Sequence, residues 1–107
     1  MSTFDPMAAV IDWLDAYRAG SLSIVDSYTS DAVLECRCSG MKAVRGRDAI
    51  TDYWARRFAE RPAGELVDLQ PIENAIVVSY RVPDGLVQAT LYFDGSGRIV
   101  RSVCGPI

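Results

Sequence analysis

Residues 28–54 constrain the fold of this chain more than any other segment. A helical pattern ends before Asp31, and residues 32–38 then alternate as in a strand with one buried face. A Ser-Gly turn and a short return strand follow, and Gly46 precedes a second amphipathic helical pattern. A helix, a strand pair and a helix in this order require a fold that packs helices on a sheet.

The flanking segments supply the remaining elements. The first helix begins at Asp5-Pro6, because Asp caps free amide groups and Pro tolerates the first helical position, and it ends at Gly20. A short helix is predicted at residues 22–28 and a third helix at Arg47–Glu60. After the first strand, further strands are predicted at about residues 41–44, 65–70, 75–82, 86–94 and 98–104. This order predicts one α+β domain over residues 1–107, with helices on one face of a bent sheet.

The order and spacing resemble the nuclear transport factor 2-like superfamily, in particular its small SnoaL-like and ketosteroid-isomerase-like members. The resemblance covers essentially the whole chain, and it rests on the Asp31-Ala32 step before the strand and on the Gly46-Arg47-Asp48-Ala49-Ile50 helix start. It implies a cone-shaped fold in which three helices pack on a strongly bent, mostly antiparallel six-stranded sheet that encloses a pocket. The resemblance also implies that the fold serves enzymes and binding modules alike.

Composition and charge argue against several classes of function. A net charge of −3 argues against a nucleic-acid binder, which needs a cationic face. Six of the eleven basic residues fall within residues 42–61, but acidic residues are interleaved, so we expect a solvated helix face, with an anion site as the alternative. The six are Lys42, Arg45, Arg47, Arg56, Arg57 and Arg61. No segment approaches the ~18 apolar residues of a membrane span, and the N-terminus has no signal-peptide pattern.

The chain has no histidine and three cysteines. The absence of histidine excludes a Ser-His-Asp triad, a Cys-His pair and histidine-ligated metal sites. Cys36 and Cys38 are two positions apart, a spacing that makes a mutual disulfide awkward and matches no common zinc pattern. We therefore expect no metal or other cofactor and a location in the reducing cytoplasm.

The resemblance to ketosteroid isomerase allows its catalytic positions to be compared with this chain. That enzyme uses a carboxylate base, with a tyrosine and a protonated aspartate that hold the enolate oxygen. Aligned on the shared features, this chain has Cys36, Trp13 and Ala89 in the three places. We therefore expect no steroid isomerase activity.

Other candidate catalytic groups are few. The epoxide-hydrolase branch implies an Asp-Arg-Asp arrangement, and the nearest equivalent is Glu35 with Arg37, which we expect to form a surface or interface ion pair. The orientation of Asp68 stays open. Cys36 is either a nucleophile at the pocket mouth or an inert core thiol, and we expect the inert form because no histidine can activate it. The same holds for Cys38 and Cys104.

The expected pocket is apolar and lined by aromatic side chains. Large amphipathic rings on two helices that face the sheet suit a flat apolar ligand, and the alternative is that these rings fill the cone. We expect core filling for Tyr17, pocket lining for Trp54 and an inward orientation for Tyr80. The predicted lining is Trp13, Tyr17, Leu34, Cys36, Tyr53, Trp54, Tyr80, Ala89, Leu91 and Ser102.

The sheet face away from the helices mixes apolar and polar residues. They are Val77, Ser79, Arg81, Gln88, Thr90, Tyr92, Ile99, Arg101 and Val103. Such a face suits an isologous homodimer, and the resemblance implies sheet-to-sheet dimers; a solvated face is the alternative.

The residues together predict a SnoaL-like domain that binds a small apolar molecule, with its reaction unassigned. One alternative is an isomerase, lyase or hydrolase that acts on a small hydrophobic substrate through a tyrosine, Asp68 or Cys36. The other is a non-catalytic dimerisation module. A one-residue slip of register in the first strand would turn Glu35 and Arg37 into the pocket.

Overall fold

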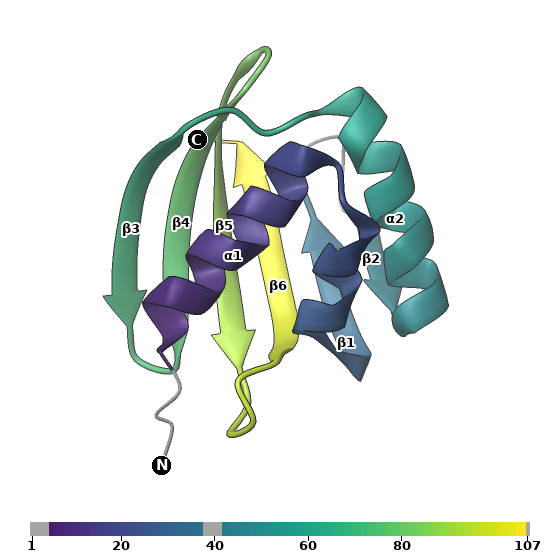
Figure 1. Ribbon diagram of the computed structural model, residues 1–107, viewed down its shortest axis with the longest axis vertical. Helices are drawn as coiled ribbons and strands as arrows, with labels where there is room; N and C mark the ends of the chain where they lie inside the picture. The colour runs from purple at the N-terminus through teal and green to yellow at the C-terminus, as the bar shows by residue number, and fades with distance from the viewer. Residues whose placement is uncertain (1–4, 38–41, 107) are drawn as a thin grey trace.

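A computed structural model describes residues 5–37 and 42–106 of the chain. Its helices cover one face of a curved six-stranded sheet with the order β2-β1-β6-β5-β4-β3 (Figure 1). The elements are α1 (Pro6–Ala19), the 3-10 helix η1 (Leu22–Ser27), β1 (Tyr28–Cys36), β2 (Lys42–Arg45), α2 (Arg47–Glu60), β3 (Leu66–Ile72), β4 (Ala75–Val82), β5 (Gly85–Phe93) and β6 (Ile99–Pro106). The expected α+β architecture of three helices on a mostly antiparallel sheet is confirmed, and the sheet is not closed into a barrel.

The first helix forms where its end signals predict. The side chain of Asp5 accepts hydrogen bonds from the amides of Met7 and Ala8, at 3.1 and 3.3 Å. Gly20 adopts a left-handed conformation with φ of 65°, and its N–H closes the last turn of α1. Neither α1 nor any other helix among the described residues has the length and apolarity to cross a bilayer.

The first strand begins earlier than its alternating pattern predicts. Tyr28, predicted to end the second helix, is the first residue of β1 and pairs with Ile99. An irregularity in the pairing between Tyr28 and Val33 interrupts the alternation, so the sequence reveals only the later half of the strand. Cys38 and the predicted Ser39-Gly40 turn lie outside the described residues.

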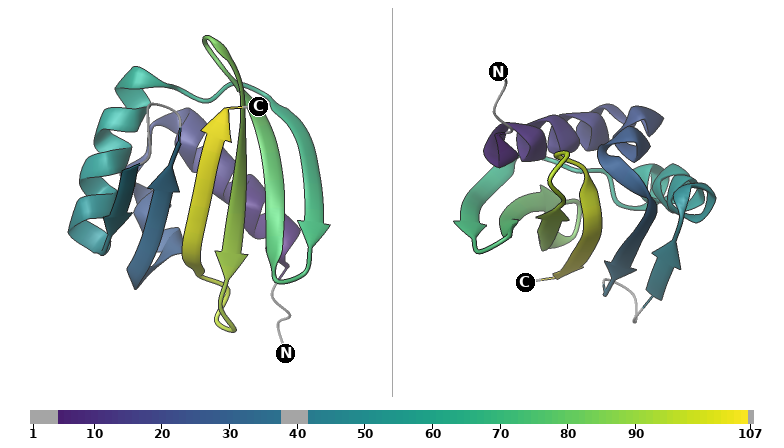
Figure 2. Two further views of the ribbon diagram at one scale, coloured as in Figure 1. Left: turned by 180° about the vertical axis from the view of Figure 1, so that it is seen from behind. Right: turned by 90° about the horizontal axis from the view of Figure 1, so that it is seen from below.

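The sheet joins its two halves through β1 and β6, which run parallel (Figure 2). Their register places Leu34 beside Ser102 and Cys36 beside Cys104. Because neighbouring residues in register project from the same sheet face, the two thiols lie on the face that the helices cover. Residues from opposite ends of the chain therefore meet in the middle of the fold.

Ile99 does not lie on the outer sheet face, and the prediction that placed it there is wrong. Its side chain is 1% exposed and belongs to the core. The pairing of β5 with β6 matches Phe93 with Ile99 and Tyr92 with Arg101, which leaves Val100 as an extra residue. This bulge reverses the alternation, so that Ile99 faces the helices while Arg101 faces away.

Candidate functional site

Aromatic rings pack together in the space between the helices and the sheet. The ring of Trp13 makes edge-to-face contacts with Tyr17, Trp54 and Tyr80, at centroid distances of 5.9, 5.8 and 6.1 Å. Tyr17 makes similar contacts with Trp54 and Tyr80, at 4.8 and 5.4 Å. All four side chains are buried. The centre of the core is therefore occupied by these side chains themselves.

Hydroxyl groups form a second buried cluster. The indole N–H of Trp13 donates to the hydroxyl of Tyr28 at 3.2 Å, and that hydroxyl lies 3.4 Å from the hydroxyl of Ser102. Burial raises the pKa of Tyr28 to about 12. These groups are neutral near pH 7, and their hydrogen bonds satisfy polar atoms within the core. The apolar side chains predicted beside them, Leu34, Ala89 and Leu91, are likewise buried.

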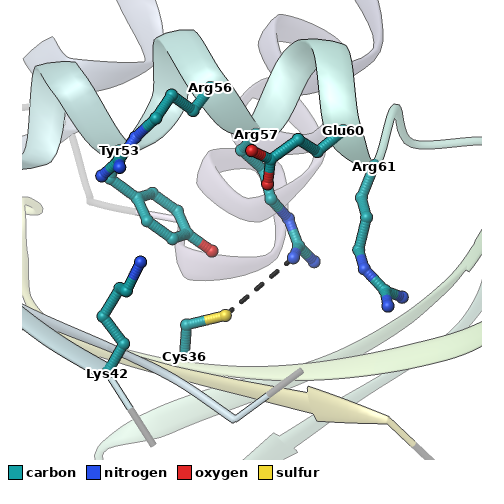
Figure 3. A pocket seen from close by; sticks show the side chains of 7 residues that line it. All are labelled: Cys36, Lys42, Tyr53, Arg56, Arg57, Glu60 and Arg61. Atoms are coloured by element: carbon teal, nitrogen blue, oxygen red, sulfur yellow. Dashed lines mark hydrogen bonds between the residues drawn. The ribbon is translucent and has the colours of Figure 1, made fainter. Parts of the chain in front are cut away.

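A cleft opens at one end of the core, between α2 and the end of β1. It has a volume of about 60 Å³. Its lining is Cys36, Lys42, Tyr53, Arg56, Arg57, Glu60 and Arg61 (Figure 3). The phenol of Tyr53 and the guanidinium of Arg57 project from α2 toward the thiol of Cys36. Of the predicted lining residues, the structure brings Cys36 and Tyr53 together at this cleft.

Arg57 is buried, and the prediction that placed it on a solvated helix face is wrong. Its side chain lies on the buried side of α2, because it follows Tyr53 by four positions and Trp54 by three. Arg57 is only 5% exposed, whereas its neighbour Arg56 is exposed to solvent. This spacing is the signal in the sequence that identifies Arg57 as an inward-facing cation.

Three nitrogens of the Arg57 guanidinium have different surroundings. Nε donates a hydrogen bond of 2.8 Å to the hydroxyl of Tyr17, and Nη1 donates to the Sγ atom of Cys36 at 3.9 Å. The guanidinium carbon also lies 5.9 Å from the centre of the Tyr17 ring. Nη2 is buried and has no hydrogen-bond partner among the described residues.

Ionisation of the groups around Arg57 is suppressed. Burial raises the pKa of Tyr17, Tyr53 and Tyr80. A hydrogen bond with Cys36, together with burial, raises the pKa of the Cys104 thiol. Burial lowers the pKa of Arg57, but Coulombic interactions with the surrounding phenols and the Cys104 thiol, which act when those groups ionise at high pH, outweigh that effect and raise its pKa. Near pH 7 a charged guanidinium therefore faces neutral phenols and a neutral Cys104 thiol.

The rim of the cleft is cationic. Lys42 and Arg56 are exposed there, and the Nη1 atom of Arg61 pairs with Asp84 at 3.0 Å. Glu60 is the one carboxylate among the lining residues, and it makes no ion pair within the described parts of the chain. Asp84 balances Arg61, and the other three cations, Lys42, Arg56 and Arg57, exceed the one carboxylate of the lining. The cleft is therefore electropositive, although the whole chain has a net charge of −3.

The thiols of Cys36 and Cys104 lie near the phenol of Tyr53. Cys36 is buried and lines the cleft, whereas Cys104 is half-buried. The hydroxyl of Tyr53 lies 3.7 Å from the Sγ atom of Cys104. Tyr53 thus links α2 to β6 beside the cleft.

The other carboxylates considered for catalysis lie away from the cleft. Glu35 accepts two hydrogen bonds from Arg101, at 2.6 and 3.0 Å, on the outer sheet face. The ion pair of Glu35 forms with Arg101 on the adjacent strand, in place of the predicted pair with Arg37. Asp68 is exposed on β3. No slip of register brings Glu35 inward.

Comparison with known proteins identifies the fold. No protein-family model matches the chain, and no curated protein matches it. Among solved structures 233 chains match, and one of them is a SnoaL-like protein of unknown function from Burkholderia thailandensis E264. The two chains share 18% sequence identity with a TM-score of 0.81, over 100% of this chain and 99% of the other. This chain therefore shares its fold with that SnoaL-like protein, and the fold is the nuclear transport factor 2-like one that the sequence predicted.

Proposed function

We propose that this SnoaL-like domain binds a small organic molecule at the cleft between α2 and the end of β1. The observation that carries the proposal is the convergence of polar atoms from Cys36, Tyr53 and Arg57 on one space (Figure 3). Binding sites typically combine a largely apolar wall with a few convergent polar groups. Here Trp54 and Tyr17 form the aromatic layer directly behind the polar groups.

Binding fits the site better than proton transfer does. Abstraction of a proton near neutral pH requires a group with a pKa close to 7. Burial moves the pKa of Tyr53 upward, away from that range. Of the three positions that correspond to ketosteroid isomerase catalysis, only Cys36 lines the cleft, whereas Trp13 and Ala89 lie in the filled core.

An enzyme that uses Cys36 as a nucleophile is the second candidate. The observation that favours it is the position of Nη1 of Arg57, 3.9 Å from Sγ of Cys36. A cation beside a thiol stabilises the thiolate, which is the nucleophilic form. Turnover abolished by Cys36→Ala with ligand binding retained would favour this candidate over a pure binding domain.

We also propose that the protein is a homodimer that pairs through its outer sheet face. Thr90, Tyr92 and Val103 are half-buried on this face within one chain. Their mixture of apolar and polar groups is suited to a self-complementary interface, and sheet-to-sheet association leaves the cleft open. Dimerisation without any ligand is the third candidate function.

Native mass spectrometry of the protein as purified tests the binding proposal. We expect a species that carries an additional small-molecule mass, which disappears when the protein is denatured. The released compound can then be identified by its mass and fragmentation. A protein without added mass that also fails to bind any member of a small-molecule library would contradict the proposal.

A further inference from the structure

We infer that the ligand of the cleft is an oxyanion, such as an organic carboxylate, whose charged group pairs with the guanidinium of Arg57. This inference rests on the proposed function and specifies the chemical class of the ligand. It arises from a buried cation that pairs with no carboxylate among the described residues.

Because the charge of Arg57 is buried, the groups that bind its N–H donors determine how much this burial costs in free energy. A guanidinium carries five N–H donors, and a buried charge without compensation is costly. Tyr17 and Cys36 account for Nε and Nη1, and the thiol is a weak acceptor. Nη2 is left without a hydrogen bond among residues 5–37 and 42–106.

No carboxylate of the described residues forms an ion pair with Arg57. The ion pairs there are Arg47–Asp26, Arg61–Asp84, Arg81–Glu65 and Arg101–Glu35. Tyr80 also lies close to the guanidinium: burial raises the pKa of its phenol, and the charge of Arg57 and a hydrogen bond with it partly offset that rise. This phenol is neutral near pH 7, and Nη2 still makes no well-directed hydrogen bond among the described residues. An anion bound in the cleft would complete both the charge balance and the hydrogen bonding of Arg57.

The size of the cleft fits the charged end of a ligand. A single water needs about 10–15 Å³ of such volume. The cleft of about 60 Å³ therefore holds a few waters or one carboxylate with part of the group attached to it. Lys42 and Arg56 on the rim add attraction for an approaching anion.

Glu60 is the rival partner for Arg57. It lines the same cleft and follows Arg57 by three positions on α2, so the two side chains lie on neighbouring parts of the helix surface. If Glu60 opposes a bound anion, Glu60→Gln will tighten anion binding by about two- to fivefold, the size of an exposed charge interaction. If Glu60 is instead the resident counter-ion of Arg57, the same variant will be markedly less stable than the wild type.

Matched charged and neutral probes test the inference on the unmodified protein. Benzoate and benzamide have the same shape and differ in charge, and acetate with acetamide forms a smaller pair. Binding is followed by NMR through the resonances of Tyr53 and of the Arg57 side chain, and inorganic phosphate is titrated in a separate experiment. We expect benzoate to bind at least about tenfold more tightly than benzamide, because a charge-assisted bond to Arg57 is lost in the amide.

The carboxylate and phosphate titrations together identify the chemical source of the anion. Binding of benzoate or acetate without phosphate would assign an organic carboxylate, and binding of phosphate alone would assign a phosphate group; both outcomes support an oxyanion ligand. Equal binding of benzoate and benzamide would overturn the inference while leaving the cleft as a binding site. If none of the anions perturbs the resonances of the cleft residues, the inference fails. The proposed function is then tested on its own by native mass spectrometry, which shows whether the purified protein carries a small molecule.

Substitution of Arg57 supplies the second test. Arg57→Gln is expected to weaken benzoate binding at least tenfold, whereas Arg47→Gln, which removes the same charge from an exposed site at the start of α2, is expected to leave it within about twofold. An equal loss in both variants would assign the effect to net charge and overturn the role of Arg57. If Arg57→Gln does not fold, the comparison of benzoate with benzamide and the Glu60→Gln variant still decide the inference.

Discussion

The Nε atom of Arg57 donates a hydrogen bond of 2.8 Å to the hydroxyl oxygen of Tyr17, which joins α2 to α1 across the core. The same hydroxyl donates to the backbone carbonyl of Arg61 at the end of α2. One phenol therefore holds both the buried cation and the last turn of the helix that carries it. The position of the cleft depends on this contact, because Tyr53 and Arg57 lie on the same helix.

Tyr17→Phe is expected to lower the free energy of unfolding by about 1–3 kcal/mol. The substitution keeps the ring contacts and removes one acceptor and one donor from buried partners, which then stay unsatisfied. Urea unfolding at pH 7 measures the change, with Tyr92→Phe on the outer face as the control. Equal stability of the two variants would contradict a structural role for the Tyr17 hydroxyl.

Arg57→Met is expected to separate stability from binding. A buried charge replaced by an apolar side chain of similar length is often neutral or stabilising, so the unfolding free energy should stay within about 1 kcal/mol of wild type or rise. Benzoate binding should nevertheless be lost. A large loss of stability in the ligand-free protein would instead mean that the chain itself compensates the charge of Arg57.

Alkaline pH is expected to destabilise the protein through its buried phenols. The pKa of Tyr28 is about 12 in the folded state, against an ordinary value of 10.0. Because the folded value is the higher one, the contribution to stability is fully present below about pH 10 and is lost as the pH rises toward 12. This difference in pKa corresponds to a loss of about 2–3 kcal/mol in the free energy of unfolding.

Urea unfolding between pH 8 and 12, followed with tyrosinate absorbance, measures this alkaline loss. Tyr28→Phe should flatten the decline, and the remaining slope should come from Tyr17, Tyr53 and Tyr80, whose pKa values burial also raises. A wild-type stability that stays constant up to pH 12 would contradict the burial of these groups.

Thr90→Arg is expected to convert the proposed homodimer into a monomer. Thr90 lies in the middle of β5 on the outer face, and an isologous interface would bring two introduced charges together without partners. Sedimentation velocity measures the mass, with Asp12→Arg on the exposed side of α1 as the control. A dimer that survives Thr90→Arg would place the interface elsewhere, and a monomeric wild type would refute the dimer.

The sequence predicts elements with strong local end signals and misses features that depend on distant partners. The bounds of α2 agree with the structure because Gly46 precedes the helix and a Pro-Gly segment follows it. The bulge at Val100 becomes visible only in the pairing of β6 with its neighbouring strands, so simple alternation assigned Ile99 to the wrong face. The parallel pairing that sets Cys36 beside Cys104 joins opposite ends of the chain and has no local pattern.

The candidate site was only partly predictable for a different reason. Cys36 and Tyr53 follow from the apolar faces of their strand and helix. Arg57 also follows the helical spacing, but its charge suggested a solvent-exposed side chain, because arginines are rarely buried without a partner. A residue whose position and chemistry disagree in this way is expected at functional or strained sites.

A pair of tryptophan substitutions on β2 tests most directly whether the cleft is the binding site. Lys42→Trp places a large ring at the cleft, whereas Ala43→Trp places the same ring on the opposite side of the same exposed strand. Native mass spectrometry of the two purified variants then compares the small-molecule mass that each retains. We expect Lys42→Trp to lose the ligand and Ala43→Trp to keep it, and full retention by Lys42→Trp would show that the ligand binds somewhere else.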